Sequence, residues 1–141
     1  MMKSKSENIY IGMELPKLYK CPNTRQLVQY SGSSFDYYEI HYDKDIAIQN
    51  DLPGVIVHGA LKAAFLGELV TKWMEPTGKL LKLVIQYKGI DIPDDELMIT
   101  GKVYKLESLP VCKVAYCSLW LENSSGERTT TGSAIVQFNI H

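Results

Sequence analysis

One long apolar segment, followed by four segments of a different periodicity, constrains the fold more than any other feature of the chain. Residues 57–74, VHGALKAAFLGELVTKWM, have the spacing of an amphipathic helix of about five turns. The polar side chains are confined to one arc, and they are Lys62, Glu68, Thr71 and Lys72. The helix should therefore be mostly buried. Its charges, and a length below the roughly 20 apolar residues that a membrane span needs, argue against membrane insertion.

The four segments after this helix are long and rich in β-branched and aromatic residues, as strands are. They cover residues 79–90, 96–109, 111–123 and 128–140, with proline, aspartate, serine and glycine between them. Together with an earlier extended stretch that ends at Pro22, they predict an α+β fold. In that fold a curved antiparallel sheet, with the four strands in meander order, wraps around the long central helix. We expect residues 1–141 to form one domain, because 45% of the chain is hydrophobic and a chain of this length buries its own core.

Charge and cysteine content limit the partners and the compartment. Fifteen basic and sixteen acidic residues give a net charge of -1, which argues against nucleic acid or an anionic membrane as a partner. Cys21, Cys112 and Cys117 form no CxxC pair and leave one cysteine over in any disulfide scheme, so we expect them reduced and buried. The N-terminal MMKSKSENIY has no apolar run after its basic residues. These features predict a cytoplasmic protein without a secretory signal.

The segment before the long helix carries the residues that suggest chemistry. Asn23 or Thr24 is expected to cap a short helix that Gly32 ends, and residues 33–43, SSFDYYEIHYD, follow as an irregular loop. Two helical turns, KDIAIQND, come next, before Pro53-Gly54 forces a turn. The loop is more polar and aromatic than a core segment, so it is the first place to look for a site.

Three residues of this region supply a possible acid, a base and an oxyanion donor. Asp36 and His41 lie in the irregular loop at a spacing that allows both side chains to reach one water molecule. Gly59 begins the long helix, where backbone N–H groups are free and the helix dipole is positive. Such an end suits a developing oxyanion.

The order and spacing of these residues resemble a known family, the MaoC-like (R)-specific enoyl-CoA hydratases and dehydratases, which have the hot-dog fold. That family carries a loop of the form Ser-Gly-Asp-x-Asn-Pro-x-His, then an acidic residue, and then His-Gly at the start of the central helix. The resemblance extends over about residues 24–107, and the matching positions are Ser34, Asp36, Ile40-His41, Asp43, Leu52-Pro53 and Val57-His58-Gly59-Ala60-Leu61.

The sequence also departs from the family pattern inside the loop. Phe35 stands where the family has glycine, Tyr38 where it has asparagine and Glu39 where it has proline. The asparagine and the proline are understood to hold and shape the loop. Tyr38 is therefore a candidate to hydrogen-bond Asp36 in place of the asparagine. The aromatic residue before Asp36 and the following Ile-His-Tyr-Asp look closer to the mesaconyl-CoA hydratases.

The resemblance implies hydration of 2-enoyl thioesters, or the reverse dehydration of 3-hydroxyacyl thioesters, without a cofactor or a metal. Asp36 and His41 would hold the water, and the Gly59 N–H would bind the thioester oxygen. Ser34, Tyr38, Glu39 and His58 are expected around the substrate, with His58 bracing the loop against the helix. The substrate would be an acyl-CoA or an acyl carrier protein thioester, and the protein a homodimer that pairs sheet edge to sheet edge.

Plainer interpretations remain open for each residue. Asp36 could cap a turn, and His41 could be a half-buried histidine that donates to a carbonyl. A metal held by Asp36, Glu39, His41 and Asp43 is disfavoured, because adjacent loop residues rarely close a coordination shell. For the whole protein, two alternatives stand beside the hydratase: a hot-dog acyl-CoA thioesterase, and a non-catalytic acyl-binding subunit of a hetero-complex.

Overall fold

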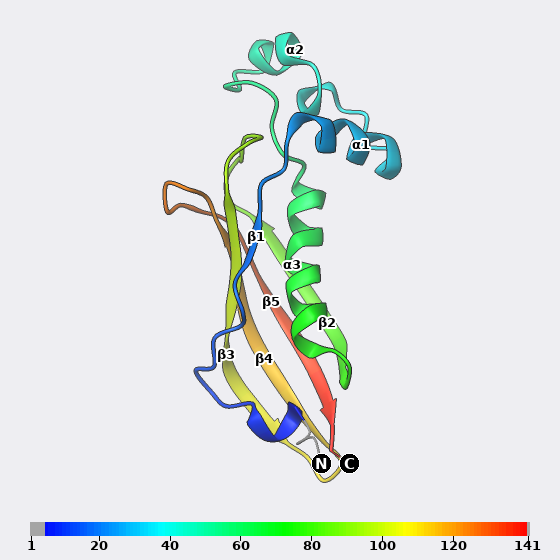
Figure 1. The fold of residues 1–141 in the computed structure, drawn as a ribbon, viewed down its shortest axis with the longest axis vertical. Coiled ribbons are helices and arrows are strands. Elements are labelled where there is room, and N and C mark those ends of the chain that lie inside the picture. The colour runs from blue at the N-terminus through cyan, green and yellow to red at the C-terminus, as the bar shows by residue number, and fades with distance from the viewer. Residues whose placement is uncertain (1–4, 141) are drawn as a thin grey trace.

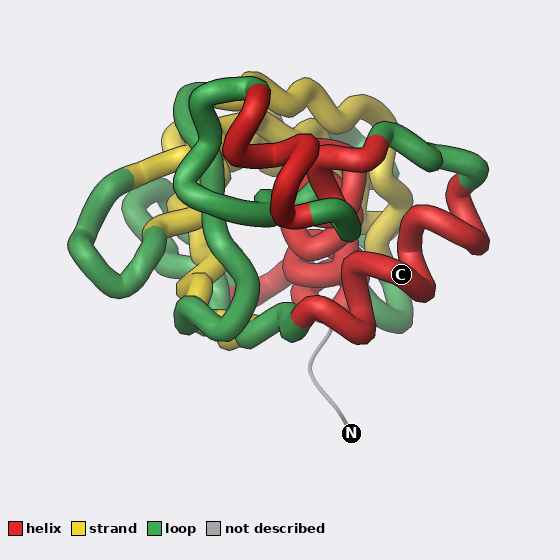
Figure 2. The backbone as a smooth tube through the Cα atoms, turned by 90° about the horizontal axis from the view of Figure 1, so that it is seen from above, coloured by secondary structure: helices red, strands yellow, loops and turns green. Residues whose placement is uncertain are grey.

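One antiparallel sheet and one long helix dominate the computed structural model, which describes residues 5–140. Residues 1–4, the start of the N-terminal stretch discussed above, and His141 lie outside the described residues. The sheet curls around α3, so the predicted α+β class and the central wrapped helix are confirmed (Figures 1 and 2). The elements are η1 Lys5–Asn8, β1 Leu18–Lys20, α1 Thr24–Ser34, η2 Glu39–His41, α2 Lys44–Gln49, α3 Gly59–Met74, β2 Gly78–Tyr87, β3 Leu97–Ser108, β4 Cys112–Glu122 and β5 Arg128–Asn139.

The strand order differs from the predicted meander. β3, β4 and β5 are neighbours in chain order, but β2 pairs with β5, so that the sheet runs β1-β3-β4-β5-β2. Each side of β3 already has a partner, because β1 pairs with it through Leu18 opposite Ile99 and β4 pairs with it on the other side. β2 is therefore placed at the far edge of the sheet.

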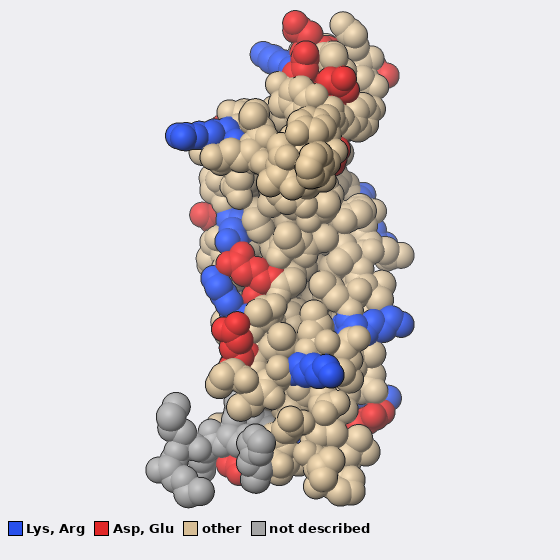
Figure 3. Space-filling view, turned by 90° about the vertical axis from the view of Figure 1, so that its right-hand side faces the viewer, with Lys and Arg blue, Asp and Glu red and all other residues tan. Residues whose placement is uncertain are grey.

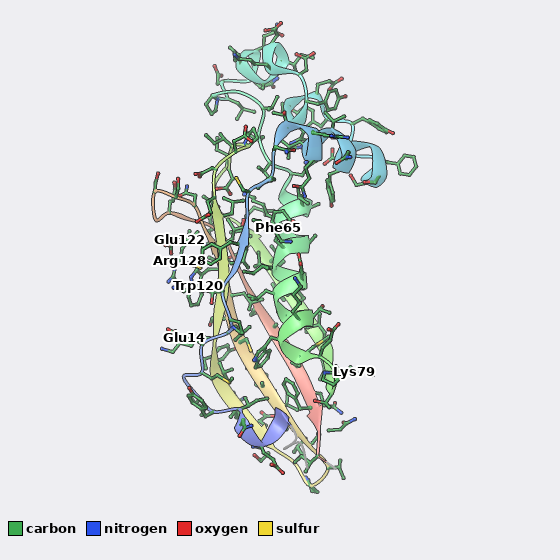
Figure 4. The ribbon with its side chains drawn as sticks, viewed as in Figure 1. Glu14, Phe65, Lys79, Trp120, Glu122 and Arg128 are labelled. Atoms are coloured by element: carbon green, nitrogen blue, oxygen red, sulfur yellow. The ribbon has the colours of Figure 1, made fainter. Side chains whose placement is uncertain are left out.

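The core lies between α3 and the inner face of the sheet. Leu66 and Val70 of α3 are fully buried, and the ring of Trp73 meets Phe138 of β5 edge to face at 5.3 Å between centroids. Each large apolar side chain buried in this way contributes about 1.5–3 kcal/mol. Figure 4 shows Phe65 between the helix and the sheet, and Trp120 on the opposite face of the sheet.

Two glycines let the sheet curl closely around α3. Gly101 and Gly132 flank Leu119 in one row across three strands. A Cβ on Gly101 would lie 2.5 Å from the Ser118 oxygen, and one on Gly132 would lie 2.5 Å from the Val84 oxygen. No side chain fits at either position, so glycine is required where a backbone oxygen of the neighbouring strand comes this close.

The helices α1 and α2 form a cap over the N-terminal end of α3 (Figures 1 and 2). Of the two predicted candidates, Asn23 is the N-cap of α1, and its side chain accepts a hydrogen bond from the Gln26 N–H at 2.9 Å. The predicted end at Gly32 is wrong, because the helix continues to Ser34 and ends at Phe35. No helix among residues 5–140 is long and apolar enough to cross a membrane.

The cysteines are only partly as predicted. Cys112 and Cys117 are buried, and burial raises the pKa of the Cys117 thiol to about 12, so this thiol is unreactive. Cys21 is exposed, because it lies in the short segment between β1 and α1 at the surface.

Candidate active site

The loop between α1 and α2 turns back onto the first residues of α3. His58 is the N-cap residue of α3 and Gly59 its first helical residue. The chain before them is fixed by two backbone hydrogen bonds, from the Ile56 N–H to the Ile40 oxygen at 3.1 Å and from the Val57 N–H to the Asp91 oxygen at 2.8 Å. The loop and the helix end therefore form one unit.

Asp36 and His41 face each other across a gap. His41 is 7% exposed, and its Nδ1 lies 2.8 Å from the Ile56 carbonyl oxygen. A carbonyl only accepts hydrogen bonds, so Nδ1 carries the proton and the neutral ring has a free lone pair at Nε2. That Nε2 lies 3.8 Å from Asp36 Oδ2, which is too long for a direct hydrogen bond and suits a shared water molecule. The side chain of Asp36 remains 41% exposed.

The ring of His58 packs against the ring of His41. It is fully buried, its Nε2 lies 2.8 Å from Ser31 Oγ, and its ring stacks on that of His41 with centroids 3.8 Å apart. Burial, and to a lesser degree the neighbouring His41, lowers the pKa of His58 to about 4, although Asp36 acts in the opposite direction. His58 is therefore neutral near pH 7. Its Nδ1 has no hydrogen-bond partner among the described residues.

Asp36, His41 and His58 are also the cluster that comes nearest to a metal site, with one ligand atom from each within 4.8 Å of the others. The two imidazole rings stack with only 21° between their planes. Because a metal ion must lie in the plane of each ring that binds it, two nearly parallel rings do not converge on one ion. Glu39 and Asp43, which the sequence offered as further ligands, are not part of this cluster.

Backbone groups hold the loop where the sequence suggested the Tyr38 hydroxyl. The Tyr38 N–H, and not its side chain, contacts Asp36, at 3.4 Å from Oδ1. The ring of Tyr38 is 52% exposed and lies edge-on to His41. A shorter hydrogen bond within the loop comes from the Tyr42 side chain, whose hydroxyl donates to the Tyr37 carbonyl oxygen at 2.6 Å.

Ser34 and Glu39 sit at the two ends of this loop and are both exposed. Ser34 Oγ donates to the Tyr30 oxygen at 2.6 Å and lies 3.4 Å from the Asp36 N–H, so it fixes the backbone of the catalytic candidate. The Glu39 carbonyl oxygen accepts from the N–H groups of Tyr42 and Asp43 and so shapes the turn. Their expected contact with substrate stays a prediction.

Three residues of the site were not singled out from the sequence. Tyr30 meets the ring of His58 edge to face at 4.8 Å, Ser31 binds His58, and the ring of Tyr87 lies against Gly59. Ser31 lies 27 residues before its partner, so no local pattern connects the two. A signal existed for Tyr87, because strand alternation places it on the same face as Ile85.

A buried ion pair lies beside Gly59. Lys62 Nζ lies 2.9 Å from Asp91 Oδ2 and 2.9 Å from the Gly89 oxygen, and the side chains of Lys62 and Asp91 are 3% and 0% exposed. The Thr129 hydroxyl donates to the same carboxylate oxygen. We call Lys62, Asp91 and Thr129 the clamp. The predicted polar arc of α3 is thus wrong for Lys62, which is buried because Asp91 pairs with it.

A cavity of about 410 Å³ lies under the cap, and its wall includes His41 but neither Asp36 nor Gly59. The three catalytic candidates therefore do not open into it together. Acidic side chains gather at the α2 end of the surface, as Figure 3 shows. Residues 36–51 contain five acidic residues and one lysine. A phosphate-bearing ligand has an electrostatic reason to approach from elsewhere.

Comparisons with known proteins bear on the family and on the fold. The family of MaoC-like domains matches residues 12–105. No curated protein matches the sequence closely enough to count as a relative.

Solved structures show the same fold at low sequence identity. The (R)-hydratase from A. caviae involved in PHA biosynthesis is 21% identical, with a TM-score of 0.83 over 92% of this chain and 97% of that one. The R-hydratase PhaJ1 from Pseudomonas aeruginosa is 18% identical, with a TM-score of 0.82 over 96% and 89%. A chain of the ChsH1-ChsH2 complex from Mycobacterium tuberculosis is 16% identical, with a TM-score of 0.81 over 92% and 98%.

Proposed function

The chain belongs to the family of MaoC-like domains, and from that membership we propose that it adds water to 2-enoyl thioesters or removes it from 3-hydroxyacyl thioesters. The acyl carrier would be coenzyme A or acyl carrier protein. Two of the similar structures are hydratases by name, which supports a reaction of this class. The reacting groups would be Asp36 and His41, with Gly59 as the oxyanion donor.

The observation that carries this proposal is the gap between Asp36 and His41. A lone pair at His41 Nε2 faces a carboxylate oxygen at 3.8 Å, and both can contact the same water molecule. The Ile56 carbonyl keeps the His41 proton on the other nitrogen, so Nε2 is ready to accept one. Base, water and acid then lie on one side of the substrate.

The proposed reaction uses only groups of this chain. The thioester oxygen binds at the Gly59 N–H, which draws electron density away from C3. The water oxygen attacks C3 and gives one proton to the Asp36–His41 pair, while the π electrons move to the thioester as an enolate. The pair then returns a proton to C2. A positioned acid or base contributes about 10²–10⁴-fold and an oxyanion donor about 10²–10³-fold.

Hydration assays with crotonyl-CoA and with a branched or dicarboxylic enoyl-CoA test this function. We expect Asp36→Asn and His41→Ala each to lower kcat by about 10²–10⁴-fold. Asp43→Asn is the matched control, because Asp43 accepts hydrogen bonds from the first N–H groups of α2 and lies outside the gap. Unchanged activity in both Asp36→Asn and His41→Ala would refute the assignment.

A thioesterase is the competing enzyme on the same fold. It would direct the water to the thioester carbon with one carboxylate, whereas hydration uses a second group to return the proton to C2. The free Nε2 of His41 beside Asp36 favours hydration. A thiol reagent distinguishes the two, because only hydrolysis of the acyl-CoA releases free thiol.

For the assembly we propose a homodimer that pairs through β2. This strand is at the edge of the sheet, and its Leu81 and Val84 are 48% and 44% exposed. A long, apolar edge strand is open to pairing with another chain. The name of the ChsH1-ChsH2 complex raises the alternative of a hetero-complex subunit. Light scattering of the purified chain gives its oligomeric state, and a hydration assay of the same sample gives its activity. A stable, active species of two identical chains supports the homodimer.

A further inference from the structure

We propose that the hydroxyl group of Tyr87 donates a second hydrogen bond to the thioester oxygen held by Gly59, which makes Tyr87 a catalytic residue. This inference rests on the proposed hydration and adds a group to its oxyanion site. The observation behind it is the contact between Tyr87 and the first residue of α3.

Tyr87 is the last residue of β2 and lies opposite Thr130 of β5. From there its ring reaches the start of α3. A Cβ on Gly59 would lie 3.1 Å from both Cε1 and Cζ of Tyr87, and 3.3 Å from Cε2. These three atoms form the end of the ring that carries the hydroxyl group. The hydroxyl end of Tyr87 therefore lies over Gly59.

The side of Gly59 that Tyr87 covers is the functional side. In a helix the Cα–Cβ bond points outward and tilts toward the N-terminus, the end from which the free N–H groups of the first turn also project. A ligand oxygen at the Gly59 N–H must therefore lie beside the ring of Tyr87. Glycine at position 59 is what allows this approach, since a larger residue would displace the ring.

The surroundings of Tyr87 are those of a site and not of a core. Tyr87 is 55% exposed, and at the helix end that it covers Gly59 is half-buried and Ala60 is exposed, whereas His58 is buried. Burial first, then the Asp36 carboxylate and Tyr87, raises the pKa of the neighbouring Tyr30 hydroxyl. Tyr30, Tyr87 and Asp36 thus share one site at the end of α3, next to the proposed water.

A second donor has a definite chemical task here. When the water oxygen bonds to C3, the electron pair of the C2–C3 double bond shifts and negative charge develops on the thioester oxygen. A donor fixed at that oxygen stabilises the enolate more than the ground state and so lowers the barrier. The Tyr87 hydroxyl keeps its proton throughout. The proton that reaches C2 still comes from the Asp36–His41 pair.

The test uses the full chain and the variant Tyr87→Phe, which keeps the ring and removes only the hydroxyl group. We expect kcat for crotonyl-CoA hydration to fall by about 10- to 100-fold with KM nearly unchanged, as for loss of a hydrogen bond to a charged group. Tyr104→Phe is the matched control, because Tyr104 is 52% exposed in β3 and lies away from the site. It should leave kcat unchanged.

Acetoacetyl-CoA supplies a readout that does not require turnover. Its enolate absorbs in the near ultraviolet, so the fraction bound as enolate reports the strength of the oxyanion site. We expect Tyr87→Phe to lower this fraction by about 10-fold at saturating acetoacetyl-CoA. Equal enolate absorbance in the wild type and Tyr87→Phe, or no enolate in the wild type, would overturn the assignment of Tyr87. A wild type that forms the enolate through Tyr87 but hydrates no enoyl thioester would instead refute the proposed reaction and keep the donor.

Discussion

Two groups of ionisable side chains flank the first turn of α3, and they are built in opposite ways. In the Asp36–His41 pair the nearest atoms are 3.8 Å apart and Asp36 is 41% exposed. In the clamp, Lys62 and Asp91 meet at 2.9 Å with almost no exposed surface. The first arrangement leaves room for a water molecule, whereas the second excludes water. The comparison indicates that one side of the helix end, where we propose the reaction, is open to solvent, and that the other side is closed.

The clamp connects the parts that the proposed site needs in register. Asp91 accepts the Val57 N–H through its carbonyl oxygen and Lys62 through its side chain, so it holds the chain on both sides of Gly59. Lys62 also donates to the Gly89 oxygen, two residues after Tyr87. A closed ion pair is therefore placed where a shift of the helix end would move Gly59 relative to Tyr87.

Breaking the clamp should have the largest effect on stability. Lys62→Met leaves the Asp91 carboxylate buried without its partner, and we expect the free energy of unfolding to fall by about 3–5 kcal/mol. Urea denaturation measures this loss of free energy of unfolding. The double variant Lys62→Met/Asp91→Leu should recover most of the loss, since it removes both charges.

An exposed pair gives the control for this experiment. Lys105 and Glu107 meet at 3.1 Å, and their side chains are 54% and 43% exposed. Lys105→Met should leave the free energy of unfolding nearly unchanged, because solvent screens an exposed pair. If Lys62→Met lowered the free energy of unfolding no more than Lys105→Met does, the clamp would not hold the helix end in place.

The lowered pKa of His58, which packs against His41, predicts a pH dependence of stability. Its pKa is about 4 in the folded protein against 6.5 ordinarily. Above pH 6.5 the ring is neutral in both states. As the pH falls from 6.5 toward 4, the unfolded chain binds a proton that the folded chain does not, so stability falls by up to about 3 kcal/mol. Below pH 4 both states are protonated and the loss stops.

Urea denaturation between pH 4 and pH 7 measures this effect. His58→Phe keeps a ring against His41 but cannot titrate, so its stability should fall less steeply over the same interval. The difference in slope should approach about 1.4 kcal/mol per pH unit. The charged and polar groups that face His58 are Asp36 and His41 from the loop and Ser31 and Tyr30 from α1, and all remain in the variant. Parallel curves for the two proteins would exclude His58 as the source.

The sequence predicted local features well and long-range partners poorly. The α3 segment, the later strands and the Asn23 cap each follow from periodicity or from one side chain next to the backbone it caps. Lys62 could not be placed, because the residue that compensates its charge lies 29 positions away. The predicted position of β2 was also wrong, because the pairing of a strand depends on which sheet edges are left free by the other strands. The spacing of Asp36 and His41 suggested their convergence and the family motif included His58, but the 3.8 Å gap also depends on the Ile56 carbonyl, which no motif marks.

The smallest expected effect concerns Phe35, the residue at which α1 ends, directly before Asp36. Its backbone has a left-handed conformation with φ 59°. Helices commonly end in glycine at such a position, because other residues meet a steric cost of about 1–2 kcal/mol there. The ring is 81% exposed, so it contributes little packing in return. Phe35→Gly should therefore raise the free energy of unfolding by up to about 1 kcal/mol, part of the gain being offset by the greater freedom of glycine in the unfolded chain. Phe35→Ala is the control: it removes the same ring but keeps the steric cost, so thermal denaturation should show no comparable gain. Equal gains in both variants would place the cost in the exposed ring instead of the backbone.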